Sequence, residues 1–315
     1  MRGLAALSVT WFHLTNGYPQ DAVGMSGSYG WLGVDAFFVI SGFVIPYSLS
    51  VSGYRIDDFA RFMARRMVRL EPPYIASVLL VVALNTVSSL SPHFAGAPQK
   101  YTVPQLLSHA LYIIPLTPFH WILPVYWSLA YEFVFYISVG LTFWILWPRN
   151  MVFTLAFAAA AVGLKFAIVG MWDARIVLFA LGAGAARHYV GRDSLIVFLA
   201  GISACVLAMV AMGSPATAAV GVVAALVIAL IRAPAWAPLT FLGSISYSLY
   251  LIHVPIGGRI VNFGRRFGEG PAYELLLSLS ALMVSLIFAW IFYRLIETTA
   301  TRWSRRVALH LEGAR

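Results

Sequence analysis

The sequence carries little charge, since only 10% of its 315 residues are Asp, Glu, Lys or Arg while 61% are hydrophobic. A soluble domain has about a quarter charged residues, so the composition excludes an ordinary soluble protein. The single cysteine, Cys205, excludes an intramolecular disulfide and a metal site made of several cysteines. With a mean hydropathy of +0.83, these values predict an integral membrane protein.

Several catalytic and binding motifs are also missing. The sequence has no Walker loop, no dinucleotide fingerprint, no HExxH and no Cys/His zinc spacing. No basic stretch is interleaved with aromatic residues on a soluble module, so the net charge of +9 does not indicate nucleic acid. We expect no metal site and no permanently bound cofactor. Any group that the protein transfers must therefore arrive already activated.

Long apolar runs dominate what is present. Runs of about 17–25 residues are long enough to cross a bilayer as helices. They predict an all-α polytopic protein with about ten transmembrane helices in one bundle, at 3–18, 31–50, 74–91, 124–147, 151–170, 174–190, 194–213, 216–232, 238–260 and 273–296. The segment 103–118 is short and bounded by prolines, which favours an interfacial or re-entrant piece.

The basic residues predict the orientation of the bundle. With ten spans, both termini lie on the side that holds most arginines, which is the cytoplasm by the positive-inside rule. The opposite side holds only Lys100, Arg175, Arg259, Arg265 and Arg266. Three of these fall in the loop 257–272, which indicates either a miscounted span or a basic patch facing an anionic partner. We expect one membrane domain over 1–315, with no appended soluble domain.

Polar residues recur at helical spacing inside the apolar runs. Arg2 and His13 share one face of the first helix, about 16 Å apart along its axis. Asp35 and Gly42 share a face of the second, and Gly42 permits close approach of a helix or a ligand. The fourth and ninth spans carry polar stripes at Ser128, Glu132 and Tyr136 and at Ser246, Tyr250 and His253. Each stripe alone is explained by contacts between helices, but two histidines and two carboxylates together are the groups of acid–base chemistry.

A basic segment, IDDFARFMARRMVRLEPPY, joins the second and third spans. Its apolar spacing predicts a helix that ends at Pro72-Pro73, with Arg61, Arg65 and Arg69 on one face and Arg66 beside them. An interfacial helix attracted to anionic lipid and a clamp for a phosphorylated ligand both fit this pattern. A phosphate clamp combined with a buried histidine suggests an acyl-CoA thioester as the donor.

Five segments resemble, in order, the signature blocks of the acyltransferase 3 family of membrane O-acyltransferases: RGLAALSVTWFH, GVDAFFVISGF, FMARRMVRLEPPY, WSLAYEF and SYSLYLIH. The resemblance implies about ten transmembrane helices in the bacterial cytoplasmic (inner) membrane. It also implies transfer of an acyl group, expected to be acetyl, from cytoplasmic acyl-CoA. The expected acceptor is a hydroxyl of a surface or exported polysaccharide.

The resemblance also implies roles for individual residues. His13 is the expected catalytic histidine and Arg2 its essential partner. The donor is expected to contact Arg65, Arg66, Arg69 and Tyr74. Further family positions are matched by Asp35, Ser41, Glu132 and His253. We expect Asp35 to orient the imidazole of His13, and Ser41 and Gly42 to line the path of the donor.

Other functions fit parts of the same pattern. Buried His, Asp and Glu side chains also serve proton-coupled transporters, although no symmetric pair of broken apolar segments indicates a transport site. A structural or regulatory membrane subunit and an acyltransferase with a small-molecule or lipid acceptor remain alternatives. His13 acts either as a base or as a transient acyl carrier. The oligomeric state is not predicted.

Overall fold

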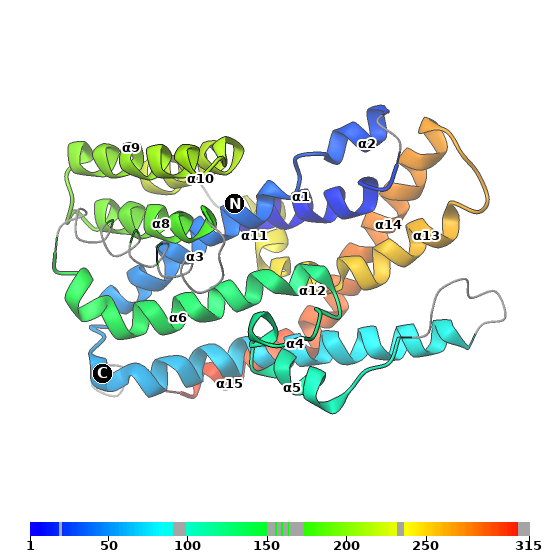
Figure 1. Ribbon diagram of the computed structural model, residues 1–315, viewed down its shortest axis with the longest axis horizontal. Coiled ribbons are helices and arrows are strands. Elements are labelled where there is room, and N and C mark those ends of the chain that lie inside the picture. Colours follow the sequence, from blue (N-terminus) through cyan, green and yellow to red (C-terminus); the bar gives the residue numbers. More distant parts are fainter. Residues whose placement is uncertain are drawn as a thin grey trace.

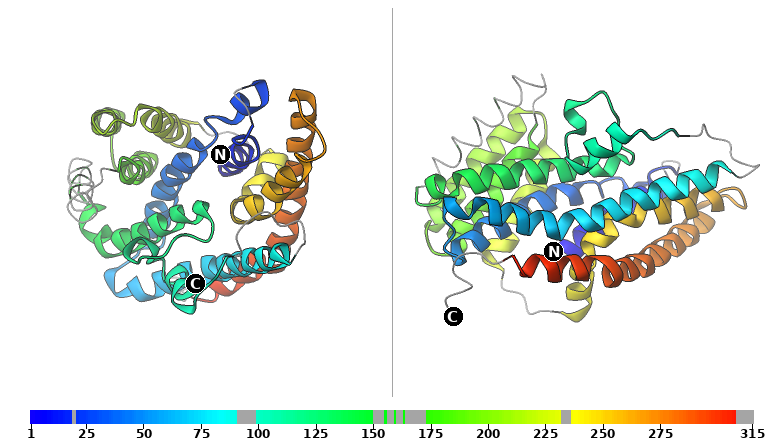
Figure 2. Two further views of the ribbon diagram at one scale, coloured as in Figure 1. Left: turned by 45° about the vertical axis from the view of Figure 1, so that its right-hand side comes forward. Right: turned by 90° about the horizontal axis from the view of Figure 1, so that it is seen from below.

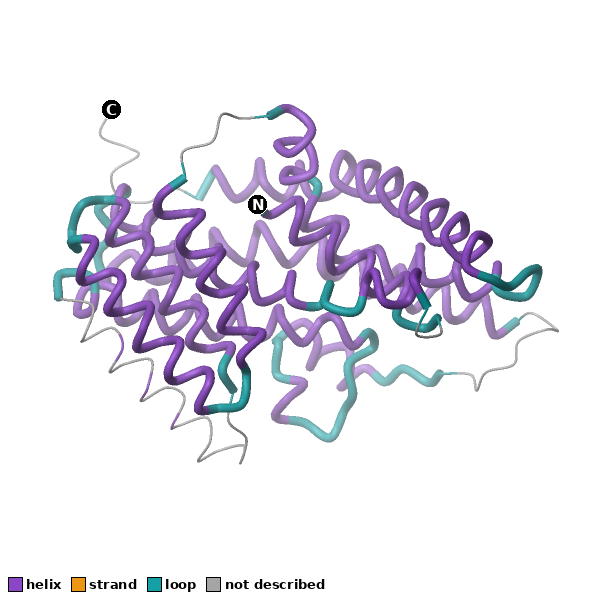
Figure 3. Tube along the Cα trace, turned by 90° about the horizontal axis from the view of Figure 1, so that it is seen from above, coloured by secondary structure: helices purple, strands orange, loops and turns teal. Residues whose placement is uncertain are grey.

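The described part of the chain is mostly helical. The computed structural model describes residues 1–18, 21–90, 99–149, 155, 159, 163, 173–231 and 236–307. These residues form helices and loops, without a strand among them (Figure 3). Many of the longer helices run roughly along the longest axis of the molecule (Figure 1). The predicted all-α class is confirmed.

The described helices follow one another along the chain. In chain order they are α1 (Arg2–Thr15), α2 (Ala22–Gly27), α3 (Leu32–Val51), α4 (Phe59–Ser89), α5 (Val103–Ala110), α6 (Trp127–Leu146), α8 (Arg175–Tyr189), α9 (Leu195–Ala211), α10 (Pro215–Leu230), α11 (Ala237–Ser244), α12 (Ser246–His253), α13 (Arg259–Gly264), α14 (Pro271–Phe292) and α15 (Thr298–Arg305). Short 3-10 turns lie at Ile56–Asp58 (η1), Ile114–Leu116 (η2) and Pro124–Tyr126 (η3), and π-helical turns at Val254–Gly258 (η4) and Tyr293–Glu297 (η5).

Among the described residues, four helical stretches are long and apolar enough to cross a membrane, or five if a bent pair counts as one span. They are Ala22–Val51, Ile56–Ser89, Pro124–Leu146 and Pro271–Arg305, and the pair Ala237–Ser244 and Ser246–Gly264, bent by 55°. The other apolar helices are shorter, and most of the predicted span 151–170 lies outside the described residues. The count of ten spans and the cytoplasmic termini therefore stay predictions.

Helix α4 continues through Pro72 and Pro73, so the prediction that these prolines end a helix is wrong. Proline removes a backbone donor, but membrane helices tolerate it where neighbouring groups satisfy the backbone. The Tyr247 hydroxyl donates to the Leu70 carbonyl over 2.9 Å, just before the prolines. The basic segment is thus the first half of a long helix.

Helices α3 and α8 approach closely through glycine. A Cβ on Gly42 would lie 2.3 Å from the Phe179 carbonyl oxygen, and one on Gly182 would lie 2.1 Å from that of Val39. Small residues allow this backbone contact between helices. The expectation that Gly42 lines a donor path is corrected, because the neighbour of this glycine is a helix.

The first helix lies alongside the ninth predicted span. A Cβ on Gly3 would come within 2.9 Å of the Gly243 backbone nitrogen, so α1 begins against α11. Further along, His13 of α1 meets His253 at the end of α12. Figure 2 shows α1 in dark blue next to the yellow helices α11 to α13. This pairing brings the two predicted histidines together.

Candidate active site

A cavity of about 280 Å³ lies where α1 ends and where α3, α6 and α8 begin. Its walls combine aromatic and apolar side chains with a few polar groups. They are Val9, Phe12, His13, Trp31, Val34, Asp35, Pro124, Val125, Trp127, Arg175 and Tyr250. A largely apolar pocket with a few convergent polar groups is the usual form of a small-molecule site. Two of the predicted catalytic residues, His13 and Asp35, line this cavity.

The rings of His13 and His253 are in contact, with centroids 5.2 Å apart and planes inclined by 46°. His13 is half-buried and His253 fully buried. The Nδ1 atom of His253 lies 3.0 Å from the Leu249 carbonyl oxygen. A carbonyl only accepts, so Nδ1 carries the proton and donates it. Nε2 of His253 is buried and has no hydrogen-bond partner among the described residues.

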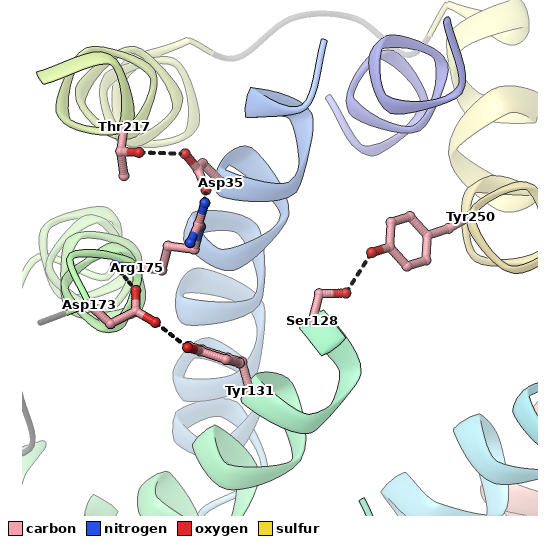
Figure 4. A network of polar contacts seen from close by, with 7 residues as sticks. All are labelled: Asp35, Ser128, Tyr131, Asp173, Arg175, Thr217 and Tyr250. Carbon is pink, nitrogen blue, oxygen red and sulfur yellow. Dashed lines mark hydrogen bonds and ion pairs between the residues drawn. The ribbon is translucent and has the colours of Figure 1, made fainter. Parts of the chain in front are cut away.

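Asp35 is fully buried and is bound to other helices. One carboxylate oxygen accepts from Nε of Arg175 over 3.3 Å, and the other accepts from the Thr217 hydroxyl over 2.8 Å (Figure 4). The described residues show no bond from Asp35 to His13. The expectation that Asp35 orients the imidazole is therefore corrected, and the group beside His13 is His253.

The polar stripes of α6 and α12 meet at Ser128 and Tyr250. Their hydroxyl oxygens are 2.6 Å apart (Figure 4). The Tyr250 hydroxyl also donates to the Val125 carbonyl over 2.7 Å. The Ser128 hydroxyl also lies 3.3 Å from the Val125 carbonyl oxygen, so either hydroxyl can be the donor in the bond that they share. The Tyr250 ring lies 5.9 Å from that of His253. This contact fixes the wall of the cavity next to the histidines.

Glu132 belongs to a second polar group. Its Oε1 accepts from the Ser41 hydroxyl over 2.7 Å and from the Tyr136 hydroxyl over 2.5 Å. The Arg66 guanidinium lies over the Tyr136 ring, 5.7 Å from its centroid. These contacts join three predicted residues, Ser41, Glu132 and Arg66, away from the residues that line the cavity.

The second polar group extends to Arg2 and to a residue that the sequence analysis missed, Glu297. Arg2 and Arg69 lie close enough for Coulombic interaction with Glu297. One Glu297 oxygen accepts from the Ser248 hydroxyl over 2.6 Å and from its backbone N–H over 3.2 Å. Glu297 stands at the end of the apolar run LIFAWIFYRLIE, and an acidic residue in that position is the sequence signal that could have identified it. Arg2 thus faces acidic and basic groups at one end of α1, and His13 faces the cavity at the other.

Tyr74 is fully buried in an aromatic group instead of meeting the arginines. Its hydroxyl lies 2.9 Å from Nδ1 of His109, whose Nε2 accepts from the Ile122 backbone N–H over 3.1 Å. The histidine therefore donates from Nδ1 to Tyr74. These bonds tie α5 and the loop after it to α4, which corrects the expectation that Tyr74 contacts the donor.

The described residues provide basic side chains that could contact a ligand in two places, along α4 and in the cavity. In the described ranges, no group of three or more His, Cys, Asp or Glu side chains is placed to hold a metal ion. Arg65, Arg66 and Arg69 follow one another along α4 and offer guanidinium groups, which suit phosphate. The cavity offers the imidazole of His13 and the guanidinium of Arg175.

Comparison with known proteins identifies the family of this chain. The sequence profile of the acyltransferase 3 family, described as an acyltransferase domain, matches residues 1–303. The chain belongs to this family. The O-acetyltransferases OatA of Staphylococcus aureus strains NCTC 8325 and COL are each 28% identical to it over 227 residues, which is 67% of this chain. No solved structure matches.

The family membership confirms the resemblance seen in the sequence, and its domain is an acyltransferase. The five sequence blocks that resemble the family fall on α1, α3, α4, α6 and α12. Each of these helices carries residues of the cavity wall or of the second polar group. The matched region is 34% of the length of each OatA protein, so the chain spans about a third of these curated relatives. The apolar helices and the family together indicate an integral membrane protein.

Proposed function

We propose that this protein is a membrane O-acetyltransferase that moves an acetyl group from acetyl-CoA to a hydroxyl of a surface or exported polysaccharide. The observation that carries the proposal is the contact of His13 with His253 at the wall of a cavity in a member of an acyltransferase family. The names of the OatA relatives favour acetyl as the acyl group. The acceptor class rests on the sequence resemblance.

The donor is proposed to bind at the basic end of the bundle. Arg65, Arg66 and Arg69 lie in the first half of α4, and Arg2 lies near Glu297 together with Arg69. Guanidinium groups bind phosphates through paired N–H donors. The phosphates of acetyl-CoA would stay here on the cytoplasmic side, while the pantetheine arm carries the thioester along α1 toward His13.

His13 is the proposed base of the reaction. Its ring nitrogens have no hydrogen-bond partner among the described residues, and the neighbouring His253 presents an Nε2 that can accept an N–H. With its own N–H held there, His13 presents a lone pair at its other nitrogen. It takes the proton of the acceptor hydroxyl, whose oxygen attacks the thioester carbonyl. The C–S bond then breaks, and the proton passes to the leaving CoA thiolate.

A two-step route uses the same groups. In it the unprotonated nitrogen of His13 attacks the thioester and forms an acyl-imidazole, with CoA leaving as the thiol. The acceptor hydroxyl then attacks the acyl group and restores the imidazole. Both routes give one ester and one free thiol for each thioester consumed.

Thiol release tests the proposal. The purified protein is mixed with acetyl-CoA, with and without a polysaccharide acceptor, and free CoA thiol and acceptor-bound acetyl are measured together. The proposal predicts that, in the presence of protein, adding the acceptor releases extra thiol above the acceptor-free hydrolysis, in an amount equal to the acceptor-bound acetyl. A proton-coupled transporter would consume no thioester, and acetyl on a lipid or small molecule would identify another acceptor.

A further inference from the structure

Arg175 occupies a position that the catalytic scheme does not use. It begins α8 and lines the cavity together with His13, although the sequence analysis treated it only as a charge at the end of a span. About a third of its side chain is exposed, 35%, whereas Asp35 next to it is fully buried. A cation at the wall of a site cavity is available to a ligand that enters there.

Two contacts hold the Arg175 guanidinium in place, and a third fixes its backbone. Its Nε donates to Asp35, and its guanidinium carbon lies 4.9 Å from the centroid of the Trp127 ring. Its backbone N–H donates to the Asp173 carboxylate over 2.9 Å (Figure 4). The terminal nitrogens, Nη1 and Nη2, have no partner among the described residues. A guanidinium held at one edge with its two outer N–H pairs open is a pre-organised donor.

Two other polar groups of the cavity, Asp35 and Tyr250, are already engaged. Both carboxylate oxygens of Asp35 accept bonds, and the Tyr250 hydroxyl is bonded to Val125 and Ser128. Among the described residues, the cavity side chains that keep free hydrogen-bonding capacity are those of His13 and Arg175, together with the indole N–H groups of Trp31 and Trp127. The volume of about 280 Å³ is small beside the 300–1,000 Å³ of typical ligand pockets, which suits one sugar unit better than acyl-CoA.

The charges around Arg175 decide which chemistry this subsite accepts. Asp35 accepts from the Arg175 guanidinium and Asp173 accepts from the Arg175 backbone N–H, and the two carboxylates lie close enough to each other for Coulombic repulsion. Asp173 also accepts a bond from the Tyr131 hydroxyl (Figure 4). A further carboxylate on a ligand would meet a surplus of negative charge, whereas a neutral hydroxyl would meet only open donors.

We propose that Arg175 and the walls around it form the acceptor subsite, which takes an uncharged pyranose of the glycan. The Nη groups donate to the oxygen of a hydroxyl next to the one that is acylated, and the indoles of Trp31 and Trp127 line the path of the sugar. This inference rests on the proposed function, because it assigns the acceptor half of the same reaction. Arg175 is then a specificity-determining residue, and His13 is the reacting one.

The test compares Arg175→Lys with the wild type. Lysine keeps the charge opposite Asp35 but loses the planar pair of N–H donors. The acceptor is a neutral oligosaccharide, or a matched oligosaccharide of hexuronic acids. Acceptor binding is measured by calorimetry, KM and kcat by acetyl transfer, and the donor step by thioester hydrolysis without acceptor. Arg266→Gln, which removes an exposed arginine outside the cavity, is the matched control.

We expect Arg175→Lys to weaken binding of the neutral oligosaccharide and to raise its KM about tenfold, since hydrogen bonds from a charged donor are lost. Thioester hydrolysis should stay unchanged, as should all values for Arg266→Gln. If Arg175→Lys does not fold, the double variant Asp35→Asn/Arg175→Gln removes both charges together and is expected to show the same loss.

Three results would overturn the inference. Unchanged binding of the neutral oligosaccharide to a folded Arg175→Lys protein is the first. Tighter binding of the hexuronic acid by the wild type is the second, and an equal fall in hydrolysis and transfer, which indicates action at the thioester, is the third. Absence of acetyl transfer in the wild type would count against the proposed function instead, and the calorimetric comparison would still decide the role of Arg175.

Discussion

The imidazole of His253 lies against that of His13, with ring centroids 5.2 Å apart, although the two residues come from opposite ends of the chain. His253 donates from Nδ1 to the Leu249 carbonyl within its own helix, so its orientation is fixed by α12. Its Nε2 is left buried and unpartnered among the described residues. In the proposed reaction this Nε2 accepts the N–H of His13, which leaves the lone pair on the other nitrogen of His13.

Replacement of His253 tests this arrangement. His253→Ala is expected to lower kcat for acetyl transfer about 10²-fold, because His13 loses the group that orients it. KM for acetyl-CoA should change little, since the proposed donor groups lie at the other end of α1. Steady-state kinetics measure both values, and His120→Ala, which removes an exposed histidine, is the control. A normal kcat in folded His253→Ala protein would show that the contact has no part in the reaction.

Asp35 is expected to affect stability more than the orientation of His13. Asp35→Ala leaves Arg175 and Thr217 without their acceptor and should lower the free energy of unfolding by about 1–3 kcal/mol. Asp35→Asn keeps an oxygen for one of them and should lose less. Thermal unfolding in detergent measures the difference. If Asp35→Asn were as inactive as a His13 variant while equally stable, Asp35 would have a direct catalytic part.

Gly42 should tolerate no side chain. Gly42→Ala would force a Cβ against the Phe179 backbone and separate α3 from α8, so we expect a loss of about 1–3 kcal/mol in stability. A larger substitution such as Gly42→Trp should prevent assembly of the two helices. Gly243→Ala is the control, because a Cβ there meets nothing within 4 Å. Equal melting temperatures for Gly42→Ala and wild type would refute the close helix contact.

The basic half of α4 should govern donor affinity. Replacement of Arg65, Arg66 and Arg69 by glutamine is expected to raise the Kd for acetyl-CoA and to leave acceptor binding unchanged, since the donor carries the phosphates. Lysine at the same positions should restore part of the affinity. Arg61→Gln, an exposed change on the same helix, is the control. Normal acetyl-CoA binding with reduced binding to anionic vesicles would assign these arginines to the lipid interface.

The sequence predicted the helical fold and the shared helix face of Glu132 and Tyr136 because both depend on local pattern. Apolar runs indicate helices, and the spacing of Ser128, Glu132 and Tyr136 predicted one shared face, which the bond between Glu132 and Tyr136 confirms for these two residues. The continuous helix through Pro72 and Pro73 was not predicted. Proline usually ends a helix in a soluble protein, and local pattern does not show that a membrane helix will continue through it.

The partners of the site residues could not be predicted, because they depend on how helices pack. Asp35 was paired with His13 because both residues were expected at a similar depth in the membrane. In the structure, α8 and α10 supply the partners of Asp35, which are Arg175 and Thr217. A glycine at position 42 is compatible with close approach of either a helix or a ligand, and only the packing of α8 against it shows which of the two is present. Glu297 was overlooked because a single acidic residue in YRLIE shows no periodicity, although it joins α12 to the end of the bundle.

The central claim is that His13 carries out acetyl transfer, and single-turnover kinetics of His13→Ala test it most directly. Purified His13→Ala, His120→Ala and wild-type proteins are mixed in excess with labelled acetyl-CoA and acceptor, after thermal unfolding has shown all three to be folded. Loss of the base should slow transfer about 10²–10⁴-fold in His13→Ala, with His120→Ala unchanged. Transfer by folded His13→Ala at the wild-type rate would contradict the account.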